Sequence, residues 1–174
     1  MTAKKKRILL FFFSLVFILA LIAIDQFTKH LAVLHLMDQD AYVLIPGVFE
    51  LRYLENHGAA FGMLQNRQLL FVFIAALMLV FAVYFLFKVP IEKKYTIPIL
   101  LGLLIVAGGI GNTIDRMLYS YVIDFLYFRL IDFPIFNVAD MYVTVSTILL
   151  FFYILFFMKD DDLTFLKLKI RKDN

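Results

Sequence analysis

Two aspartates, Asp124 and Asp140, have the residue type and the setting for general acid–base chemistry. Asp124 lies in the strand-like stretch YVIDFLYF, and Asp140 follows FNVA at the start of an apolar run. Two neighbouring carboxylates rarely ionise together, so one keeps its proton while the other acts as a base. Such a pair can activate water and protonate a leaving amine, which hydrolyses a peptide bond without a metal or a covalent nucleophile. The alternatives are a helix cap for Asp140 and a loop acid for Asp124.

A second polar group precedes these aspartates. Asn112, Asp115 and Arg116 fall at i, i+3 and i+4 on one helix face, after small residues that allow another helix to approach closely. Either they form a structural polar clamp, or Asn112 and Arg116 present a donor and a positive charge to a reacting carbonyl. Asp25 and Lys29 are four residues apart, in the favoured order for a helical ion pair, and we expect them to brace neighbouring helix ends.

Other catalytic chemistries lack their residues. The chain has no cysteine, which excludes disulfides, thiolate catalysis and cysteine-ligated metals. The histidines His30, His35 and His57 show no metal-ligand spacing with a carboxylate, and the sequence has no phosphate-binding glycine loop. We therefore expect neither a metal nor a cofactor.

The composition places these side chains in a membrane protein. The 174 residues are 63% hydrophobic with a mean hydropathy of +0.89, well above the apolar share of soluble domains. Four apolar runs are each at the lower end of what crosses a hydrocarbon core about 30 Å thick. These predicted spans are residues 8–24, 69–87, 95–111 and 141–158. The length predicts one domain, residues 1–174, and polar residues at its span ends are a functional-site hypothesis by default.

Charge orients the predicted spans. Most of the 17 Lys and Arg residues lie in the N-terminal KKKR, in the link between the second and third runs, and in the tail 159–174. The positive-inside rule makes these segments cytoplasmic, so both termini are inside and the loops 25–68 and 112–140 are outside. The first run is interpreted as a retained signal anchor because no small-residue cleavage site follows it. The net charge of +3 requires no nucleic-acid partner.

Strand-like segments lie in both predicted outer loops. Residues 42–54 alternate, are rich in β-branched and aromatic side chains, and contain the turn signal Pro46-Gly47. They predict a small hairpin on the outer membrane surface, with an irregular interfacial loop as the alternative. Residues 121–128 form a second strand-like stretch, which contains Asp124.

Five short blocks occur in order along nearly the whole chain. They are DQFTK at 25–29, NHGAAFG at 56–62, GNTIDR at 111–116, VIDF at 122–125 and FNVAD at 136–140. With this order, the chain resembles the lipoprotein signal peptidases (signal peptidase II), a family of bacterial membrane aspartic proteases. Each block is weak alone, but five in this order within four spans are highly specific.

The resemblance implies an all-α polytopic membrane protein with four transmembrane helices and a small extracytoplasmic β-cradle. It implies an aspartic endopeptidase that removes signal peptides from diacylglyceryl-modified prolipoproteins, cleaving before the lipidated cysteine, without a cofactor. Its catalytic aspartates correspond to Asp124 and Asp140. The supporting or substrate-binding residues that it implies are Asp25, Lys29, Asn56, Gly58, Gly108, Asn112, Asp115, Arg116, Asn137 and Ala139.

The resemblance also implies a location and partners. The chain would lie in the bacterial cytoplasmic (inner) membrane with its active site at the outer leaflet, in contact with membrane lipids. Its partners would be the lipid-modified prolipoprotein substrate and the cyclic peptide inhibitor globomycin.

A small proton- or cation-coupled transporter subunit is the alternative function, with buried carboxylates as its ion sites. A transporter predicts ionisable residues near the middle of the spans. Here the span interiors are almost uncharged, and the polar residues gather at one outer level. A pure assembly factor, the third possibility, gives no reason for two convergent aspartates.

Overall fold

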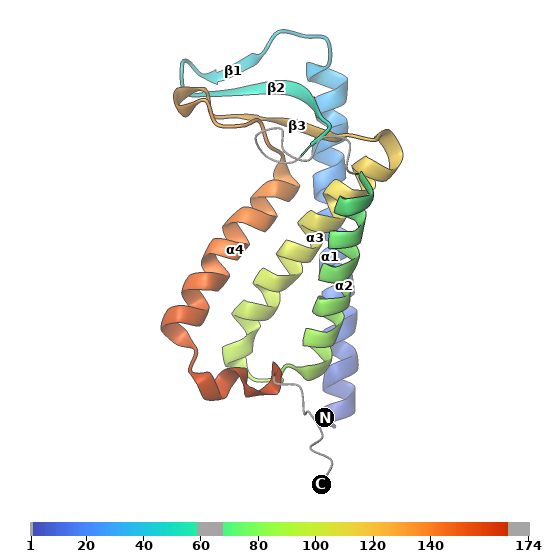
Figure 1. Cartoon of the computed structure of the whole chain (residues 1–174), viewed down its shortest axis with the longest axis vertical. Helices are drawn as coiled ribbons and strands as arrows, with labels where there is room; N and C mark the ends of the chain where they lie inside the picture. Colours follow the sequence, from blue (N-terminus) through green and yellow to red (C-terminus); the bar gives the residue numbers. More distant parts are fainter. Residues whose placement is uncertain (1, 59–67, 167–174) are drawn as a thin grey trace.

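The computed structural model describes residues 2–58 and 68–166. Four long helices make up most of these residues, and a three-stranded sheet lies across one end of them (Figure 1). The helices are α1 (Ala3–Leu36), α2 (Gln68–Lys88), α3 (Thr96–Tyr119) and α4 (Val138–Phe157). The strands are β1 (Tyr42–Ile45), β2 (Phe49–Asn56) and β3 (Val122–Tyr127). Three short 3-10 turns, η2 (Lys93–Tyr95), η3 (Arg129–Ile131) and η4 (Asp160–Leu166), complete the elements.

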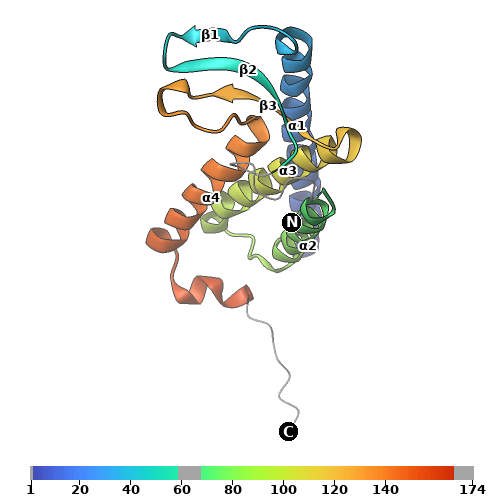
Figure 2. The same cartoon turned by 45° about the horizontal axis from the view of Figure 1, so that its top comes forward.

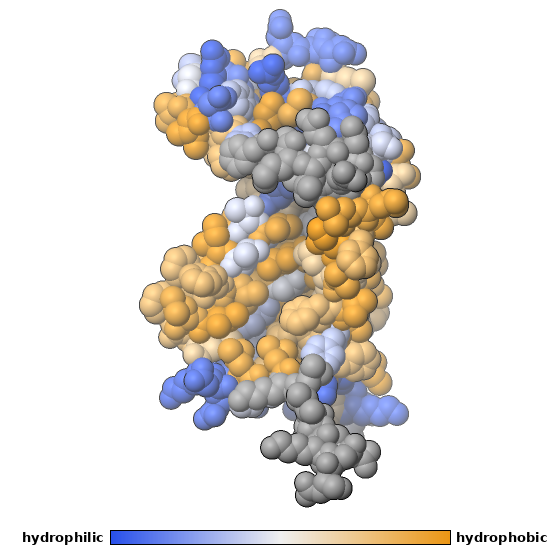
Figure 3. Space-filling model, viewed as in Figure 1, coloured by the Kyte–Doolittle hydropathy of each residue, from blue (hydrophilic) through white to orange (hydrophobic). Residues whose placement is uncertain are grey.

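The helices have the length and the surface of membrane-spanning segments. Within the described residues, α1, the segment Lys93–Tyr119 and α4 are each long and apolar enough to cross a membrane, and α2 contributes a shorter apolar helix, Val72–Lys88. Large apolar side chains cover the outside of the bundle, while hydrophilic side chains lie at its two ends (Figure 3). Such an apolar surface is suited to contact with the hydrocarbon of a membrane. Hydrocarbon offers no hydrogen bonds, so the backbone must form its own, as it does in a helix. The chain is a multi-pass membrane protein.

Two helices extend beyond the apolar runs of the sequence. α1 continues past residue 24 to Leu36, and α3 continues past residue 111 to Tyr119, where the sequence places the beginnings of outer loops. A span predicted from hydropathy stops at the first polar residues, so it is shorter than the helix. The backbone stays helical because those polar side chains are paired inside the bundle, and they are therefore carried on rigid helices.

The hairpin predicted for residues 42–54 is confirmed. β1 pairs antiparallel with β2, with Tyr42 opposite Leu51. Gly47 in the turn between them has φ +72°, a conformation that favours glycine. The N–H of Val48 donates to the carbonyl of Ile45 at 3.0 Å and closes the turn.

The second strand-like stretch is confirmed as β3, which pairs antiparallel with β2 and completes the sheet in the order β1-β2-β3. Alternate side chains of β3, Ile123 and Phe125, pack in one apolar cluster with Ala32 and Leu36 near the end of α1. This cluster holds the sheet on α1. It also directs the other face of β3, which includes Asp124, away from α1, because successive strand residues point to opposite faces.

Helix α3 is central, since it lies between α4 on one side and α1 and α2 on the other and packs against all three (Figure 2). Close approach to α4 occurs at Gly108. A Cβ atom there would meet the backbone carbonyl of Ala139 and the side chain of Val143 closer than real Cβ atoms approach their neighbours. Small residues at such crossings let helices pack in membranes.

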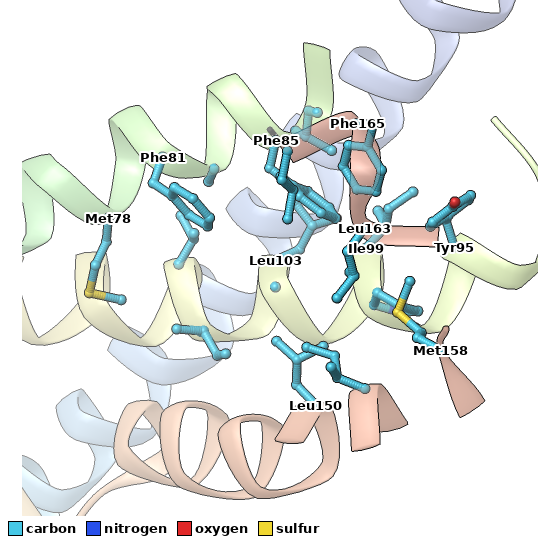
Figure 4. A pocket seen from close by; sticks show the side chains of 18 residues that line it. Met78, Phe81, Phe85, Tyr95, Ile99, Leu103, Leu150, Met158, Leu163 and Phe165 are labelled. Atoms are coloured by element: carbon cyan, nitrogen blue, oxygen red, sulfur yellow. The ribbon is translucent and has the colours of Figure 1, made fainter. Parts of the chain in front are cut away.

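An apolar cavity of about 220 Å³ lies between α2, α3 and α4, at the end away from the sheet (Figure 4). Phe85, Leu103, Leu150 and Phe165 are among the side chains that line it, one each from α2, α3, α4 and η4. Its lining has no carboxylate, amine or imidazole, so it offers no acid–base chemistry.

Replacement of Gly108 by alanine is expected to destabilise the fold by about 1–3 kcal/mol, because the clash involves backbone that cannot rotate away. The matched control is Gly102→Ala in the same helix, where a Cβ has no atom within 4 Å. Thermal unfolding in detergent micelles should show a lower midpoint for Gly108→Ala and no decrease for Gly102→Ala. Equal midpoints for the two variants would contradict the close helix contact.

Candidate active site

Asp124 is held from both sides by amide donors. Its side chain lies on β3 and is 1% exposed. Its Oδ2 accepts a hydrogen bond from Asn56 Nδ2 at 2.8 Å, and its Oδ1 accepts one from Asn137 Nδ2 at 2.6 Å. Asn56 reaches Asp124 because it ends β2, the strand paired with β3. The carboxylate is therefore fixed in position by two neutral donors.

Asp140 combines two roles that the sequence presents as alternatives. Asn137 is the N-cap of α4 and accepts from the Asp140 N–H at 2.9 Å, while Asp140 Oδ2 accepts from the Asn137 N–H at 3.1 Å. These reciprocal bonds are a capping box. The other oxygen, Oδ1, accepts from Asn112 Nδ2 at 2.7 Å. The cap is thus present, and it orients the carboxylate as well as stabilising the beginning of α4.

The two aspartates are connected through asparagine side chains. Asn137 Nδ2, which donates to Asp124, also lies 3.0 Å from Asn112 Oδ1, and Asn112 in turn donates to Asp140. Asn137 is completely buried, and Asn112 is 9% exposed. Within this network each oxygen of both carboxylates accepts a hydrogen bond from an amide group.

Asp124 and Asp140 line one pocket of about 180 Å³ at the sheet end of the helices. Its remaining lining residues are Asn56, Asn112, Arg116, Val122, Pro134 and Ile135. The Arg116 guanidinium donates to the carbonyl of Gly58 at 3.0 Å, which ties the end of the β2 segment to α3. The block NHGAAFG at 56–62 is described only as far as Gly58, and its remainder lies outside the described residues.

A buried ionic cluster lies beside this pocket. Lys29 Nζ is 2.9 Å from each of three acceptors, namely Asp25 Oδ2, Asp115 Oδ2 and Asn112 Oδ1. The lysine is 1% exposed, and both aspartates are completely buried. The expected pair of Asp25 and Lys29 is confirmed, and so is the expected pairing of polar α3 side chains across the bundle.

The cluster also binds backbone groups of neighbouring elements. Asp25 Oδ1 accepts from the N–H of Ala139 in the first turn of α4 at 2.9 Å, and Asp115 Oδ2 accepts from the N–H of Ile123 in β3 at 3.2 Å. Gly111 leaves room for this arrangement, because a Cβ there would lie 2.6 Å from the Asp25 carboxylate. The cluster therefore fixes α4 and β3, the two elements that carry Asp140 and Asp124.

Gln26 is a polar residue of this region that the sequence analysis does not single out. Its Nε2 lies 2.8 Å from Asp115 Oδ1 and 3.2 Å from both Asp25 Oδ2 and the Gly111 carbonyl. The sequence feature that could have identified Gln26 is its position inside the DQFTK block, next to Asp25 at the end of a long apolar run. It acts as a bridge between α1 and α3.

Burial raises the pKa of Asp124 from its ordinary value of 3.8 to about 7, and the nearby Asp140 carboxylate adds to this effect. Hydrogen bonds from Asn56 and Asn137 and the charge of Lys29 oppose the rise in this pKa. Between about pH 4 and pH 7 the folded chain holds a proton here that the unfolded chain releases, so this group lowers folding stability as the pH rises through that window.

The predicted site residues fall into two groups in the structure. Those at the pocket are Asn56, Asn112, Arg116, Asp124, Asn137 and Asp140. Those that support it are Asp25, Lys29 and Asp115 in the ionic cluster, Gly108 and Ala139 at the helix contact, and Gly58 through its carbonyl. Within residues 2–58 and 68–166, no group of three His, Asp or Glu residues has an arrangement that could hold a metal ion.

A polar pocket lined by one buried and one half-buried aspartate, at one end of an apolar helix bundle, is the kind of site that an aspartic hydrolase embedded in a membrane requires. The family model described as "Signal peptidase (SPase) II" matches residues 17–156. The chain belongs to the signal peptidase II family of proteases, which confirms the resemblance seen in the sequence. The transporter alternative finds no support in this assignment.

Relatives and solved structures agree with the family assignment. The lipoprotein signal peptidase of Streptococcus pyogenes serotype M5 (strain Manfredo) is 45% identical over 149 residues, covering 84% of this chain and 91% of the relative. Two solved structures, described as bacterial membrane enzymes determined by the in meso method at 2.3 and 1.9 Å resolution, each give a TM-score of 0.70. They are 30% and 31% identical to this chain, covering 82% and 83% of it and 87% and 94% of their own lengths.

Replacement of Lys29 by methionine is expected to destabilise the protein by about 3–5 kcal/mol, because two buried carboxylates lose their common cation. The matched control is Lys94→Met, which removes a half-exposed lysine paired with Asp162; water screens this ion pair, so its loss should change the stability far less. Denaturant unfolding in detergent micelles measures both. A Lys29→Met variant as stable as the control would show that the ionic cluster does not hold the elements together.

Proposed function

We propose that this chain is an aspartic endopeptidase that removes the signal peptide from diacylglyceryl-modified prolipoproteins, cleaving before the lipidated cysteine, with Asp124 and Asp140 as its catalytic residues. The observation that carries the proposal is the shared pocket, in which both carboxylates are fixed by amide donors. The relative named lipoprotein signal peptidase, at 45% identity, supports the substrate class.

The chemistry follows from a pair of carboxylates that holds one proton. The ionised carboxylate takes a proton from water as the water oxygen attacks the scissile carbonyl. The protonated carboxyl then supplies a proton to the leaving amine as the C–N bond breaks. The raised pKa of Asp124 supports this arrangement, since a pKa of about 7 lets the pair retain one proton near neutral pH. The pair titrates as a unit, and its members exchange the roles of acid and base during turnover.

The asparagines and the arginine orient this pair. Asn56, Asn112 and Asn137 donate to the two carboxylates and keep each in one rotamer. Arg116 lines the same pocket and places a guanidinium where negative charge develops on the substrate carbonyl. Holding the reacting groups in place before the substrate arrives lowers the cost of reaching the transition state.

The membrane arrangement we propose has four transmembrane helices, α1 to α4, in a single domain of residues 1–174. Both termini lie on the cytoplasmic side of the bacterial inner membrane. The first turns of α1, which contain KKKR at residues 4–7, and the link between α2 and α3, which contains Lys93 and Lys94, lie at the end opposite the sheet (Figure 1). This supports a cytoplasmic location for that end by the positive-inside rule. The pocket then lies at the level of the outer leaflet.

That depth suits the proposed substrate. An acylated peptide is retained in the outer leaflet, so a pocket at this level meets the scissile bond while the acyl chains stay in the hydrocarbon. The sheet would act as a cradle that aligns the peptide in an extended conformation. Globomycin, a cyclic peptide, would compete for the same pocket. No step in this mechanism calls for a cofactor.

Asp124→Asn and Asp140→Asn are each expected to reduce turnover of a lipidated prolipoprotein by at least about 10²- to 10⁴-fold, because each removes one partner of the acid–base pair. The measurement is a gel-shift cleavage assay, with thermal unfolding to confirm that each variant is folded. Asp132→Asn, which changes a carboxylate outside the pocket, is the matched control.

Two outcomes of this assay would count against the proposal, in different ways. Near wild-type turnover in a folded Asp124→Asn or Asp140→Asn variant would refute the catalytic pair. Efficient cleavage of the same precursor without its lipid would leave the pair intact but refute the proposed substrate class.

The pH profile should reveal the proton that the pair holds. We expect kcat/KM to fall as the pH rises above about 7, because the pair then loses its acid. Asn56→Ala removes a donor that favours ionised Asp124, so the alkaline limb should move to higher pH. A limb that stays in place or moves to lower pH in Asn56→Ala would show that it does not report Asp124.

A further inference from the structure

The apolar cavity between α2, α3 and α4 is open at its rims. Phe81 of α2 and Ile154 of α4 line it from either side of α3 (Figure 4), yet their side chains are still 61% and 38% exposed. Gly102 of α3 also lines the cavity, and a Cβ atom there would have no atom of a neighbouring element within 4 Å. The cavity therefore contains unfilled space that an apolar segment can reach from the surrounding hydrocarbon.

The position of residues around α3 shows which apolar recess is in line with the pocket of the two aspartates. Asn112 lines that pocket. At about 3.6 residues per turn, the cavity residues Ile105 and Pro98 lie within about 40° of Asn112 around the helix axis. A second apolar recess, a groove of about 650 Å³, lies between α1 and the beginning of α3. Its residues Leu100 and Thr96 lie about 120° and 160° from Asn112. The pocket therefore shares a face of α3 with the cavity and not with the groove.

Helix α4 shows the same alignment. Asp140 lines the pocket, whereas Ile154 and Met158 line the cavity. Both apolar residues lie within about 40° of Asp140 around the axis of α4. Two helices thus carry pocket residues and cavity residues on one face each. A polypeptide that extends from the pocket into the membrane along this face reaches the cavity.

The length of this face suits a signal peptide. Its far end is closed by η4, which crosses from the end of α4 toward α2 (Figure 1). Phe165 of η4 lines the cavity and packs against Phe85 and Tyr95, with ring centroids 5.8 and 5.4 Å apart. Along α3, about 21 Å separate Asn112 at the pocket from Pro98 near this end. The apolar segment of a signal peptide has about 7–15 residues, which span about 10–22 Å as a helix.

We propose that the cavity binds the apolar segment of the substrate's signal peptide while the scissile bond lies in the pocket. The segment lies as a helix along the shared face of α3, close to Gly102, because a glycine lets two helices approach closely in a membrane. Side chains on one face of the segment enter the cavity, and the opposite face stays in contact with lipid. This inference rests on the proposed function, because its ligand is part of the proposed substrate. It assigns Gly102 and Ile105 to substrate binding and makes η4, which follows the family-matched residues 17–156, the end of the binding site.

Disulfide cross-linking tests the contact directly. The chain has no cysteine, so Ile105→Cys in the cavity and its matched control, Leu100→Cys in the groove, each introduce a single thiol. Each is combined with Asp124→Asn to slow cleavage and is placed in lipid nanodiscs. The partners are lipidated precursors with one free cysteine at successive positions of the apolar segment. Because a disulfide requires Cα atoms within about 7 Å, we expect cross-links to Ile105→Cys that recur every three or four positions, and none to Leu100→Cys. No cross-link to Ile105→Cys, or equal cross-linking of the control, would overturn the inference.

Filling the cavity should weaken substrate binding without slowing the chemistry. Gly102→Phe is expected to raise KM for the full precursor about tenfold with kcat near wild type, because its ring takes the place of one buried substrate side chain. The matched control is Leu100→Phe, which adds a ring on the other side of α3 and should leave KM unchanged. Thermal unfolding confirms that both variants are folded.

A short lipidated peptide that lacks the apolar segment separates binding in the cavity from a general defect. Gly102→Phe should cleave this peptide like the wild type. An unchanged KM for the full precursor, or an equal loss with the short peptide, would overturn the inference. If the wild type cleaved no lipidated substrate at all, the proposed function would fail instead.

Discussion

The buried ammonium group of Lys29 is the interaction on which the rest of the structure depends. A cation that is 1% exposed inside a membrane protein persists only if its donors all find acceptors, and here Asp25, Asp115 and Asn112 supply three at 2.9 Å. Each aspartate also accepts from a backbone N–H. Asp25 uses its other oxygen for the N–H at the beginning of α4, and Asp115 uses the same Oδ2 for the N–H in β3. One lysine on α1 thereby links α3, α4 and the sheet, which are the elements that form the pocket.

The same cation sets the orientation of the pocket amides. Because Lys29 occupies Oδ1 of Asn112, the Nδ2 group of that asparagine is directed to Asp140. Asn137 is constrained in a similar way, since its Oδ1 accepts from the N–H of Asp140 and its Nδ2 is left for Asp124. Lys29 therefore influences both carboxylates through their hydrogen-bond donors. A buried ion pair adds little net stability, but it selects one arrangement of a polar network.

The sequence predicts the local features of this arrangement well, and the long-range features less completely. Alternation and the Pro-Gly turn predict the hairpin, and four-residue spacing predicts the pair of Asp25 and Lys29, because both signals involve residues that are close in the sequence. The pairing of Lys29 with Asp115, the threefold bridge of Gln26 and the full length of α1 depend on which helices meet, and hydropathy does not encode that. The two explanations for Asp140 appeared exclusive in sequence, yet one carboxylate has two oxygens and serves both.

The register of β3 connects apolar packing to the position of the acid. Residues Val122 to Phe125 are all buried, although a strand side chain points to alternate faces. Ile123 and Phe125 pack against the end of α1, while Val122 and Asp124 line the pocket. A slip of one residue would exchange these faces and place an apolar side chain where Asp124 now meets its two asparagines. Hydrophobic contact with α1 therefore stabilises the very register that buries a carboxylate at a cost, and so it keeps the pKa of Asp124 high.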